Sequence, residues 1–248
     1  MSEPVVAVVV GAGLGLRYGG RVPKPALKLT GRALLLMSVE AMAAGGCTHA
    51  VLVVNKQVAR RLRKTLAAAP IPIIKTYGGA SRQESVFNGL KVVRDDPALA
   101  GAKIVLIHDA VRPMVPANVV ASVIEAVRGG AEAVAPALAV TDSMRTVDLD
   151  GQTQVIDRAM LRSIQTPQGF PRDVIINAHT RLADSGAEFT DDLSCAEQAG
   201  HRVVLVEGSR LSMKVTEPTD LTVARSLWKI RDTLGHHSGR RLRRILES

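Results

Sequence analysis

The sequence predicts an α/β protein with a doubly wound, mostly parallel sheet and an inserted β-arm. Short runs rich in Val, Ile and Leu alternate with helical patterns along most of the chain, which is typical of repeated βα units. The 248 residues suffice for one such domain, and one Trp, two Tyr and three Phe leave Val, Leu, Ile and Ala to form its core. We expect a single domain over residues 1–234 and a basic tail over residues 235–248.

The first half of the chain contains consecutive βα units. Residues 5–10 form an uninterrupted apolar run, as expected of a strand that is buried on both faces of a parallel sheet. A helix at about residues 33–44, a strand at 50–55, a helix at about 57–68 and a strand at 71–75 follow in alternation. This order predicts parallel strands that are covered by helices.

A capping box predicts where the next helix begins. In Ser81-Arg82-Gln83-Glu84, Ser and Glu lie three residues apart, so each side chain can bond to a free backbone N–H at a helix start. The helix should continue to about Val93. It is followed by a strand at residues 103–108, a helix at about 116–128 and a strand at 131–140.

The pattern changes at residues 141–158, which are polar and rich in turn residues. Asp148-Leu149-Asp150-Gly151 is a hairpin signal inside this segment, which we therefore expect to leave the main sheet as a β-arm. Helical and strand patterns return after the arm. We expect a helix from Pro171 to about residue 183, a helix capped by Thr190-Asp191-Asp192, a strand at 201–206 and a helix from Pro218 to about residue 234.

The net charge of +9 is concentrated near the C-terminus. Residues 225–248 contain seven Lys or Arg and two Asp or Glu, so +5 of the total lies there. The rest of the chain is mildly basic, and aromatic residues are too scarce for the base stacking on which single-stranded nucleic-acid binding depends. We expect small anionic substrates rather than nucleic acid, and we interpret the Arg-rich tail as a solvated end.

The cysteines and the N-terminus predict a cytoplasmic protein. Cys47 and Cys195 belong to no CxxC or Cys/His cluster, so we expect both to be reduced core residues. The start lacks the basic region of a signal peptide, and the uncharged run at residues 4–16 is too short to span a bilayer. We expect no membrane contact.

The loop after the first strand is suited to a polyphosphate. Gly11-Ala12-Gly13-Leu14-Gly15 lets backbone N–H groups approach an anion because the glycines have no Cβ in the way. Arg17 and Lys24 add positive charge along the same loop. A simple turn from strand to helix is the alternative interpretation of this loop taken alone.

Spacing argues against two familiar phosphate loops. A dinucleotide fingerprint requires Gly three residues after its second Gly, but Leu16 or Tyr18 stands there, and Asn55 replaces the acidic ribose ligand. A P-loop requires Lys-Ser/Thr where Arg21-Val22 stands. The sequence therefore disfavours NAD binding and a P-loop kinase or ATPase.

More polar residues follow the other predicted strands. Ligands of open parallel sheets bind beyond the carboxyl ends of the strands, where Gly78-Gly79-Ala80-Ser81-Arg82 and Asp109-Ala110-Val111-Arg112-Pro113 lie. Several cations would meet at one cleft, which suits a site for several phosphates. They are Arg17, Lys24, Arg112, Arg158 and Lys214.

These residues resemble the cytidylyltransferases of the methylerythritol phosphate route to isoprenoids, over the chain up to about Arg225. The resemblance rests on the order of several motifs. They are the glycine loop with Arg17 and Pro23-Lys24, Gly78-Gly79-x-x-Arg82-x-x-Ser85, His108-Asp109-Ala110-Val111-Arg112-Pro113, Asp142-Ser143-Met144, Asp157-Arg158, Thr166-Pro167-Gln168, Thr190-Asp191-Asp192 and Lys214-Val215-Thr216.

The resemblance implies a Rossmann-like nucleotidyltransferase domain that transfers a cytidylyl group from CTP to 2-C-methyl-D-erythritol 4-phosphate and releases pyrophosphate, with Mg²⁺ assisting. That family forms no covalent enzyme intermediate, so alignment and neutralisation of developing charge carry its catalysis. The choice of CTP over UTP is likewise taken from the resemblance.

Roles for individual residues also come from the resemblance. Arg17 and Lys24 would stabilise the transition state at the α-phosphate, and Arg158 and Lys214 would position the incoming phosphate. The sugar-alcohol phosphate would be bound by Asp109, Arg112, Ser143, Thr166 and Thr190, and the nucleotide by Gly11, Ala12, Gly13, Gly15, Gly79, Arg82 and Ser85. Mg²⁺ would be held mainly by the phosphates of CTP, with Asp109 as the candidate protein ligand.

The arm corresponds to a dimerisation arm of that family, which implies a homodimer with Ser143 and Arg158 in the site of the partner. Two departures stand out: Val10-Gly11-Ala12-Gly13 replaces the usual Pro-Ala-Ala-Gly, and Ser143 replaces Thr. They leave ribitol 5-phosphate open as an alternative substrate. A nucleotide- or RNA-binding protein without catalysis is the non-enzymatic alternative.

Overall fold

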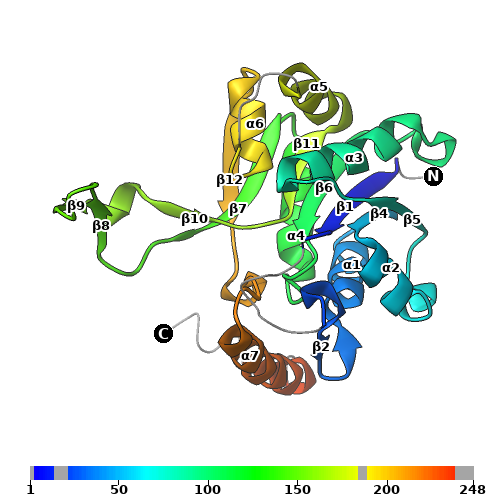
Figure 1. Ribbon diagram of the computed structural model, residues 1–248, viewed down its shortest axis with the longest axis horizontal. Helices are drawn as coiled ribbons and strands as arrows, with labels where there is room; N and C mark the ends of the chain where they lie inside the picture. Colours follow the sequence, from blue (N-terminus) through cyan, green and yellow to red (C-terminus); the bar gives the residue numbers. More distant parts are fainter. Residues whose placement is uncertain (1–2, 14–21, 184–188, 238–248) are drawn as a thin grey trace.

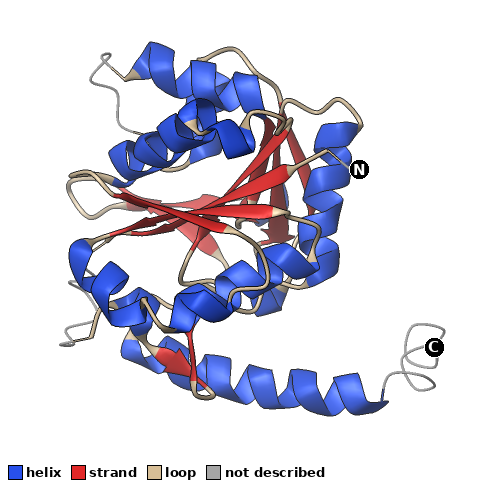
Figure 2. Cartoon of the chain, turned by 90° about the vertical axis from the view of Figure 1, so that its right-hand side faces the viewer, coloured by secondary structure: helices blue, strands red, loops and turns tan. Residues whose placement is uncertain are grey.

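The structure, a computed structural model, describes residues 3–13, 22–183 and 189–237, and it describes side chains up to residue 230. A single mixed, mostly parallel sheet lies at its centre, with helices on both faces (Figures 1 and 2). The strands run in the order β10-β7-β11-β6-β1-β4-β5, and β12 pairs with β7. This architecture confirms the predicted doubly wound α/β class.

The main sheet contains β1 (Val5–Gly11), β4 (His49–Val54), β5 (Ile73–Tyr77), β6 (Ile104–Asp109), β7 (Ala133–Ala139), β10 (Arg162–Ile164), β11 (Gln168–Pro171) and β12 (Val203–Glu207). The α-helices are α1 (Leu34–Ala44), α2 (Lys56–Leu62), α3 (Arg82–Asp95), α4 (Ala117–Arg128), α5 (Arg172–Leu182), α6 (Asp192–Gln198) and α7 (Pro218–His237). Short elements include the hairpin of β2 (Lys28–Leu29) with β3 (Arg32–Ala33), and the turn of 3-10 helix η2 (Lys24–Ala26).

Strand β1 lies inside the sheet and explains why the first apolar run has no polar face. It pairs in parallel with β4 on one side and β6 on the other. Val5, Ala7 and Val9 belong to a core with α1 and α4, whereas Val6 and Val8 belong to a second core with α3, α5 and α6. Side chains on both faces are therefore buried, and the strand ends at the glycine loop.

Two parts of the sheet differ from the prediction. Residues 57–68, predicted as one helix, form α2 and a separate 3-10 turn, η3 (Thr65–Ala68). Four cations at residues 60–64 repel one another at helical spacing, and no acidic residue lies in the segment to offset them. The antiparallel strands β10 and β11 were not expected, because segments of three or four residues are too short to show a period of alternation, and β11 also contains Gly and Pro.

The capping box is only half formed. The Ser81 hydroxyl accepts from the Glu84 N–H at 3.0 Å, as predicted for the start of α3. The Glu84 carboxylate, however, accepts from the Ala80 N–H at 2.7 Å rather than from Ser81. The reciprocal bond thus reaches one residue further back and orders the loop that precedes the helix.

The predicted β-arm is a two-stranded hairpin, β8 (Met144–Val147) with β9 (Thr153–Ile156), that pairs with no strand of the main sheet. It extends away from the body in Figure 1. The Asp148 carboxylate accepts from the N–H groups of Asp150 and Gln152, and Gly151 has a φ of 78°, which glycine adopts readily. The turn signal in the sequence therefore produced the expected turn.

Helix α7 continues to His237, three residues past its predicted end at 234. The division into one domain and a tail from residue 235 stays a prediction. No helix in the described part of the chain combines the length and the apolar composition needed to cross a bilayer.

A candidate active-site cleft at the carboxyl ends of the strands

A cleft of about 790 Å³ lies where β1, β4, β5 and β6 end. Its lining includes the glycine loop after β1, Asn55 after β4, residues 78–82 after β5, and Asp109 at the end of β6. Lys24 and Lys214 reach the same cleft from η2 and from the loop before α7. The sheet therefore brings together residues from five distant stretches of the sequence, at the edge where the sequence predicted them.

One wall of the cleft is backbone, and two loops meet there very closely. A Cβ on Gly78 would lie 2.2 Å from the Ala12 Cβ and 2.7 Å from the Ser85 Oγ, so no side chain fits at this position. The Ser85 hydroxyl accepts from the Gly79 N–H at 3.1 Å and donates to the Ser81 carbonyl at 2.8 Å. This packing holds the predicted nucleotide-binding residues Gly11, Ala12, Gly13, Gly79 and Ser85 next to one another.

Asn55 organises the same wall, a role that the sequence analysis did not assign. Its Oδ1 accepts from the Val58 N–H at 2.8 Å and caps α2, while its Nδ2 donates to the Ala12 carbonyl at 3.0 Å. One side chain therefore fixes both a helix start and the glycine loop. Its position directly after a strand was the available signal, but its partner 43 residues away was not visible in the sequence.

A second part of the lining, the charged wall, is centred on Asp109. The Asp109 carboxylate lies 3.0 Å from Lys214 Nζ, 3.4 Å from Arg112 Nε and 3.7 Å from Arg82 Nε. Burial alone would raise the pKa of Asp109, but attraction to these three cations outweighs it and holds the pKa well below its usual range. Asp109 and Asp192, which pairs with Arg82, are two carboxylates against these three cations, so a net positive charge remains and an anionic ligand is favoured.

Contacts outside the cleft fix the two arginines. Arg82 Nη2 lies 2.8 Å from Asp192 Oδ2, and the other oxygen of this buried carboxylate lies 3.2 Å from His179 Nε2. Arg112 Nη1 donates to the Ser212 carbonyl at 2.7 Å. Both guanidinium groups are therefore oriented before any ligand arrives.

The remaining predicted site residues lie elsewhere. Ser143 and Arg158 are exposed on the arm, where Arg158 donates to the Thr141 carbonyl, and neither lines the cleft of its own chain. Thr190 is exposed just before α6, and Thr166 is buried behind Asp109. Arg17 and Gly15 lie outside the described residues.

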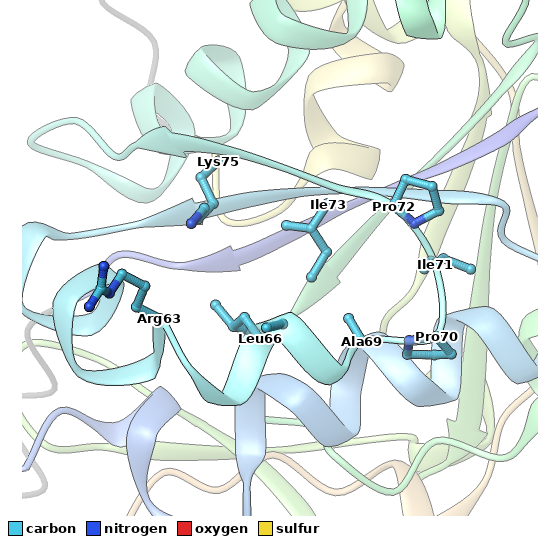
Figure 3. Close-up of a pocket in the computed structure, with 9 residues that line it drawn as sticks. Arg63, Leu66, Ala69, Pro70, Ile71, Pro72, Ile73 and Lys75 are labelled. Atoms are coloured by element: carbon cyan, nitrogen blue, oxygen red, sulfur yellow. The ribbon is translucent and has the colours of Figure 1, made fainter.

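A second hollow, of about 520 Å³, lies at the edge of the sheet between η3 and β5 (Figure 3). Leu66 and Ile73 form part of an apolar lining, and Arg63 and Lys75 supply its charge. It contains none of the residues predicted for the site and no carboxylate among its lining residues. The chemistry-bearing residues gather in the first cleft.

The described residues offer neither a metal cage nor a reactive thiol. Within residues 3–13, 22–183 and 189–237, no group of three or more His, Cys, Asp or Glu side chains is placed to hold a metal ion. Burial raises the pKa of both Cys47 and Cys195 to about 12, so neither supplies a thiolate near neutral pH. The cleft therefore acts through its cations, its carboxylate and its backbone.

Known proteins resemble this chain over most of its length. The family model described as 2-C-methyl-D-erythritol 4-phosphate cytidylyltransferase matches residues 5–229. Relatives that carry this name are 41% identical in Streptomyces avermitilis, over 89% of this chain and 90% of the relative, and 40% identical in Streptomyces coelicolor, over 89% and 83%.

Solved structures give the same result. The crystal structure of 2-C-methyl-D-erythritol 4-phosphate cytidylyltransferase from Thermus thermophilus is 30% identical, with a TM-score of 0.72 over 92% of this chain and 98% of that one. The crystal structure of 4-diphosphocytidyl-2C-methyl-D-erythritol synthase from Anaerococcus prevotii is 26% identical, with a TM-score of 0.79 over 92% and 96%.

Proposed function

Because the chain belongs to the 2-C-methyl-D-erythritol 4-phosphate cytidylyltransferase family, we propose that its cleft holds CTP against the glycine wall and the sugar-alcohol phosphate against the charged wall. The chain is a nucleotidyltransferase that transfers the cytidylyl group of CTP to 2-C-methyl-D-erythritol 4-phosphate in isoprenoid precursor biosynthesis. A phosphate oxygen of the alcohol attacks the α-phosphorus of CTP. The new P–O bond forms as the bond to the β-phosphate breaks, and pyrophosphate leaves.

The observation that carries the assignment of the walls is the excess of cations around Asp109. In this reaction negative charge builds on the α-phosphate and on the leaving pyrophosphate, so fixed positive groups stabilise the transition state most. Lys24 lies beside the glycine loop, and we assign it with Arg17 to the α-phosphate. Lys214 lies on the charged wall beside Asp109, and we assign it to the incoming phosphate.

The remaining predicted site residues are assigned to one of the two substrates. We assign cytosine and triphosphate binding to Gly11, Ala12, Gly13, Gly15, Gly79, Arg82 and Ser85, and binding of the sugar-alcohol phosphate to Asp109, Arg112, Ser143, Thr166 and Thr190. The support is the location of Gly11, Ala12, Gly13, Gly79 and Ser85 along the glycine wall of the cleft, and of Asp109 and Arg112 along the charged wall. Arg82 belongs to the charged wall and lies close to Ser85 in the sequence.

Mg²⁺ enters this proposal as part of the substrate, bound to the phosphates of CTP. Asp109, the one protein ligand considered from the sequence, is already engaged by Lys214, Arg112 and Arg82, so the described residues do not fit a resident metal ion. We expect turnover to require Mg²⁺ together with CTP. We also expect the melting temperature of the protein alone to be the same with and without EDTA.

We further propose that the protein works as a homodimer in which each arm reaches the cleft of the partner. The arm is polar overall, but it exposes large apolar side chains that include Val147, Leu149, Val155 and Met160. Ser143 and Arg158 lie on the same arm, away from the cleft of their own chain. A cytoplasmic location stays a prediction from the sequence.

The direct test is pyrophosphate release from CTP with each of two polyol phosphates, 2-C-methyl-D-erythritol 4-phosphate and ribitol 5-phosphate. We expect turnover with the first and about a hundredfold lower kcat/KM with the second, which is the discrimination that a pocket typically achieves between substrates that differ by a methyl or a hydroxyl group. UTP in place of CTP tests the base in the same assay. Absence of turnover with both polyol phosphates would contradict the proposal.

A further inference from the structure

A buried hydrogen-bonded chain lies directly behind Asp109. His108 is completely buried in β6, with its Nδ1 at 3.0 Å from the Thr166 hydroxyl and its Nε2 at 3.2 Å from the Arg112 carbonyl oxygen. The Thr166 hydroxyl also accepts from the Asp109 N–H at 3.2 Å. His108 therefore connects to both ends of the turn from Asp109 to Arg112, which is closed by the Arg112 N–H on the Asp109 carbonyl at 3.0 Å.

The partners of His108 determine where its proton lies. A carbonyl oxygen only accepts, so Nε2 must carry the proton that meets Arg112, and Nδ1 is left as an acceptor. The opposite tautomer would place two lone pairs face to face at a completely buried side chain, which carries the full penalty of an unsatisfied buried group. The Thr166 hydroxyl then donates its only proton to Nδ1.

The electrostatic surroundings keep the ring neutral. Burial lowers the pKa of His108 to about 4, and the positive charge of Arg112 acts in the same direction. Together they outweigh the attraction of Asp109 and the backbone hydrogen bonds of Arg112 and Thr166, which raise the pKa. Near neutral pH the imidazole therefore retains one acceptor nitrogen, and the Thr166 proton has a fixed recipient.

We propose that His108 and Thr166 are positioning residues for the Asp109–Arg112 turn, and that Thr166 donates no hydrogen bond to a phosphate of either substrate. The inference rests on the proposed function, and it narrows what Thr166 does there. Its proton points inward to His108, one lone pair accepts from the Asp109 N–H, and any group that meets the remaining lone pair must be a donor. Phosphate oxygens are acceptors, so they are left to the cations and the backbone N–H groups of the cleft.

The position of the turn matters because it aims both charged side chains of one wall. Asp109 faces Lys214 and Arg82, and Arg112 reaches both Asp109 and the Ser212 carbonyl. Catalytic geometry tolerates errors of about 0.5 Å, so a turn released at either end should lower turnover by displacing Asp109 and Arg112.

The first experiment reads the tautomer directly. The full chain is labelled with ¹⁵N-histidine, and long-range ¹H–¹⁵N spectra are recorded at pH 7 with and without saturating 2-C-methyl-D-erythritol 4-phosphate. The His108 signals are identified by their loss in His108→Gln. We expect a neutral ring protonated at Nε2, unchanged when the ligand is added. A ring protonated at Nδ1, a charged ring, or an Nδ1 signal that moves to its unbonded position with ligand would overturn the proposal.

The second experiment is a double-mutant cycle on turnover between Thr166→Val and His108→Gln. An amide nitrogen of Gln reaches about as far as Nε2, so His108→Gln keeps the donor to Arg112 and loses the acceptor for Thr166. We expect each single variant to lower kcat/KM about thirtyfold, and the double variant to lower it at most about threefold further, because both break the same bond. Additive losses would show that Thr166 contacts substrate independently of His108.

Conservative variants control for folding. Thr166→Ser keeps the hydroxyl, so its kcat/KM should lie within about threefold of that of the unmodified chain. His108→Asn keeps an acceptor near the place of Nδ1, so its kcat/KM should be higher than that of His108→Gln. The tautomer experiment needs no turnover, whereas the assay of the unmodified chain tests the proposed function alone. A protein that is active but has the wrong tautomer would therefore refute only this inference.

Discussion

The cleft and the arm hold their predicted functional side chains in opposite ways: those around Asp109 in the cleft are paired within one chain, and those of the arm are exposed. In the cleft, Asp109 has 10% side-chain exposure and three cationic partners, all from its own chain. On the arm, the side chains of Val147 and Val155 are 67% and 72% exposed. The cleft is organised by one chain before any ligand binds, whereas the arm presents a surface whose use requires another molecule. Variants of the two regions should therefore fail in different ways.

The largest effect is expected from the cleft. Lys24→Met removes a positive charge beside the glycine loop but keeps the length of the side chain. We expect kcat to fall about a thousandfold while the affinity for CTP falls less than tenfold, because the charge acts mainly in the transition state. Single-turnover rates and CTP binding by calorimetry measure the two quantities separately.

Lys28→Met is the matched control for this variant. Lys28 is exposed in β2, close in sequence, and does not line the cleft. It should leave kcat unchanged. Equal losses of kcat and of CTP affinity in Lys24→Met would show that Lys24 only binds the nucleotide.

The second effect tests whether the arm completes a partner's site. Arg158→Ala should lower turnover about a hundredfold, with no change in CTP binding by the same chain. Mixing it with Lys24→Met, after dissociation and reassociation, should restore about a quarter of the activity of the unmodified dimer. Half of the dimers are then mixed, and one of the two sites in each mixed dimer combines an intact cleft with an intact arm.

The arm's apolar surface provides the control for complementation. Val155→Asp places a charge on the proposed contact, so it should favour the monomer in sedimentation and abolish complementation. If mixing the two inactive variants restores nothing while both remain dimeric, Arg158 does not act in the partner's site.

The two regions also differ in how far the sequence predicted them. Periodicity located the central strands, and the rule that ligands bind at strand carboxyl ends then predicted that Lys24, Gly79, Asp109 and Lys214 would meet. The turn signal at 148–151 likewise located the arm, because hairpins are specified locally. Long-range hydrogen bonds have no such local signal. The bonds of Asn55 to Ala12, His108 to Thr166 and Asp192 to Arg82 join residues 43, 58 and 110 positions apart, so they became visible only in the fold.

The third effect is a loss of folding stability at acidic pH, which should depend on His108 behind the cleft and not on the arm. His108 has its pKa lowered to about 4 in the folded protein, against an ordinary value near 6.5, so the unfolded chain binds a proton that the folded chain excludes. The stabilisation is complete above pH 6.5 and is lost as the pH falls toward 4. Between pH 7 and pH 5 we expect a loss of about 2 kcal/mol in the free energy of unfolding from this group.

Denaturant unfolding at the two pH values measures this loss, with two variants as references. Arg158→Ala on the arm should lose as much stability as the unmodified chain, whereas His108→Gln should lose about 2 kcal/mol less. The carboxylates whose pKa is lowered, Asp109 and Asp192, titrate below this range and do not interfere. An unchanged acid loss in His108→Gln would place its origin elsewhere.

The smallest effect tests whether the glycine wall is held by a single side chain. Asn55→Ser keeps an oxygen that can cap α2 but is too short to donate to the Ala12 carbonyl, so it separates the two roles of Asn55. We expect KM for CTP to rise about tenfold with kcat and the melting temperature unchanged, because a displaced loop weakens binding in the ground and transition states alike. Asn55→Ala should show the same rise in KM and also lose about 1 kcal/mol of stability, since the cap is removed as well.

If KM in Asn55→Ser equals that of the unmodified chain, the glycine loop holds its shape through Gly78 and Ser85 alone, and the preorganisation of the cleft resides in its backbone. A rise in KM would show instead that Asn55, a neutral side chain that takes no part in the reaction, fixes the position of the glycine loop. The arm residues cannot have this effect on the cleft of their own chain, because they do not line it.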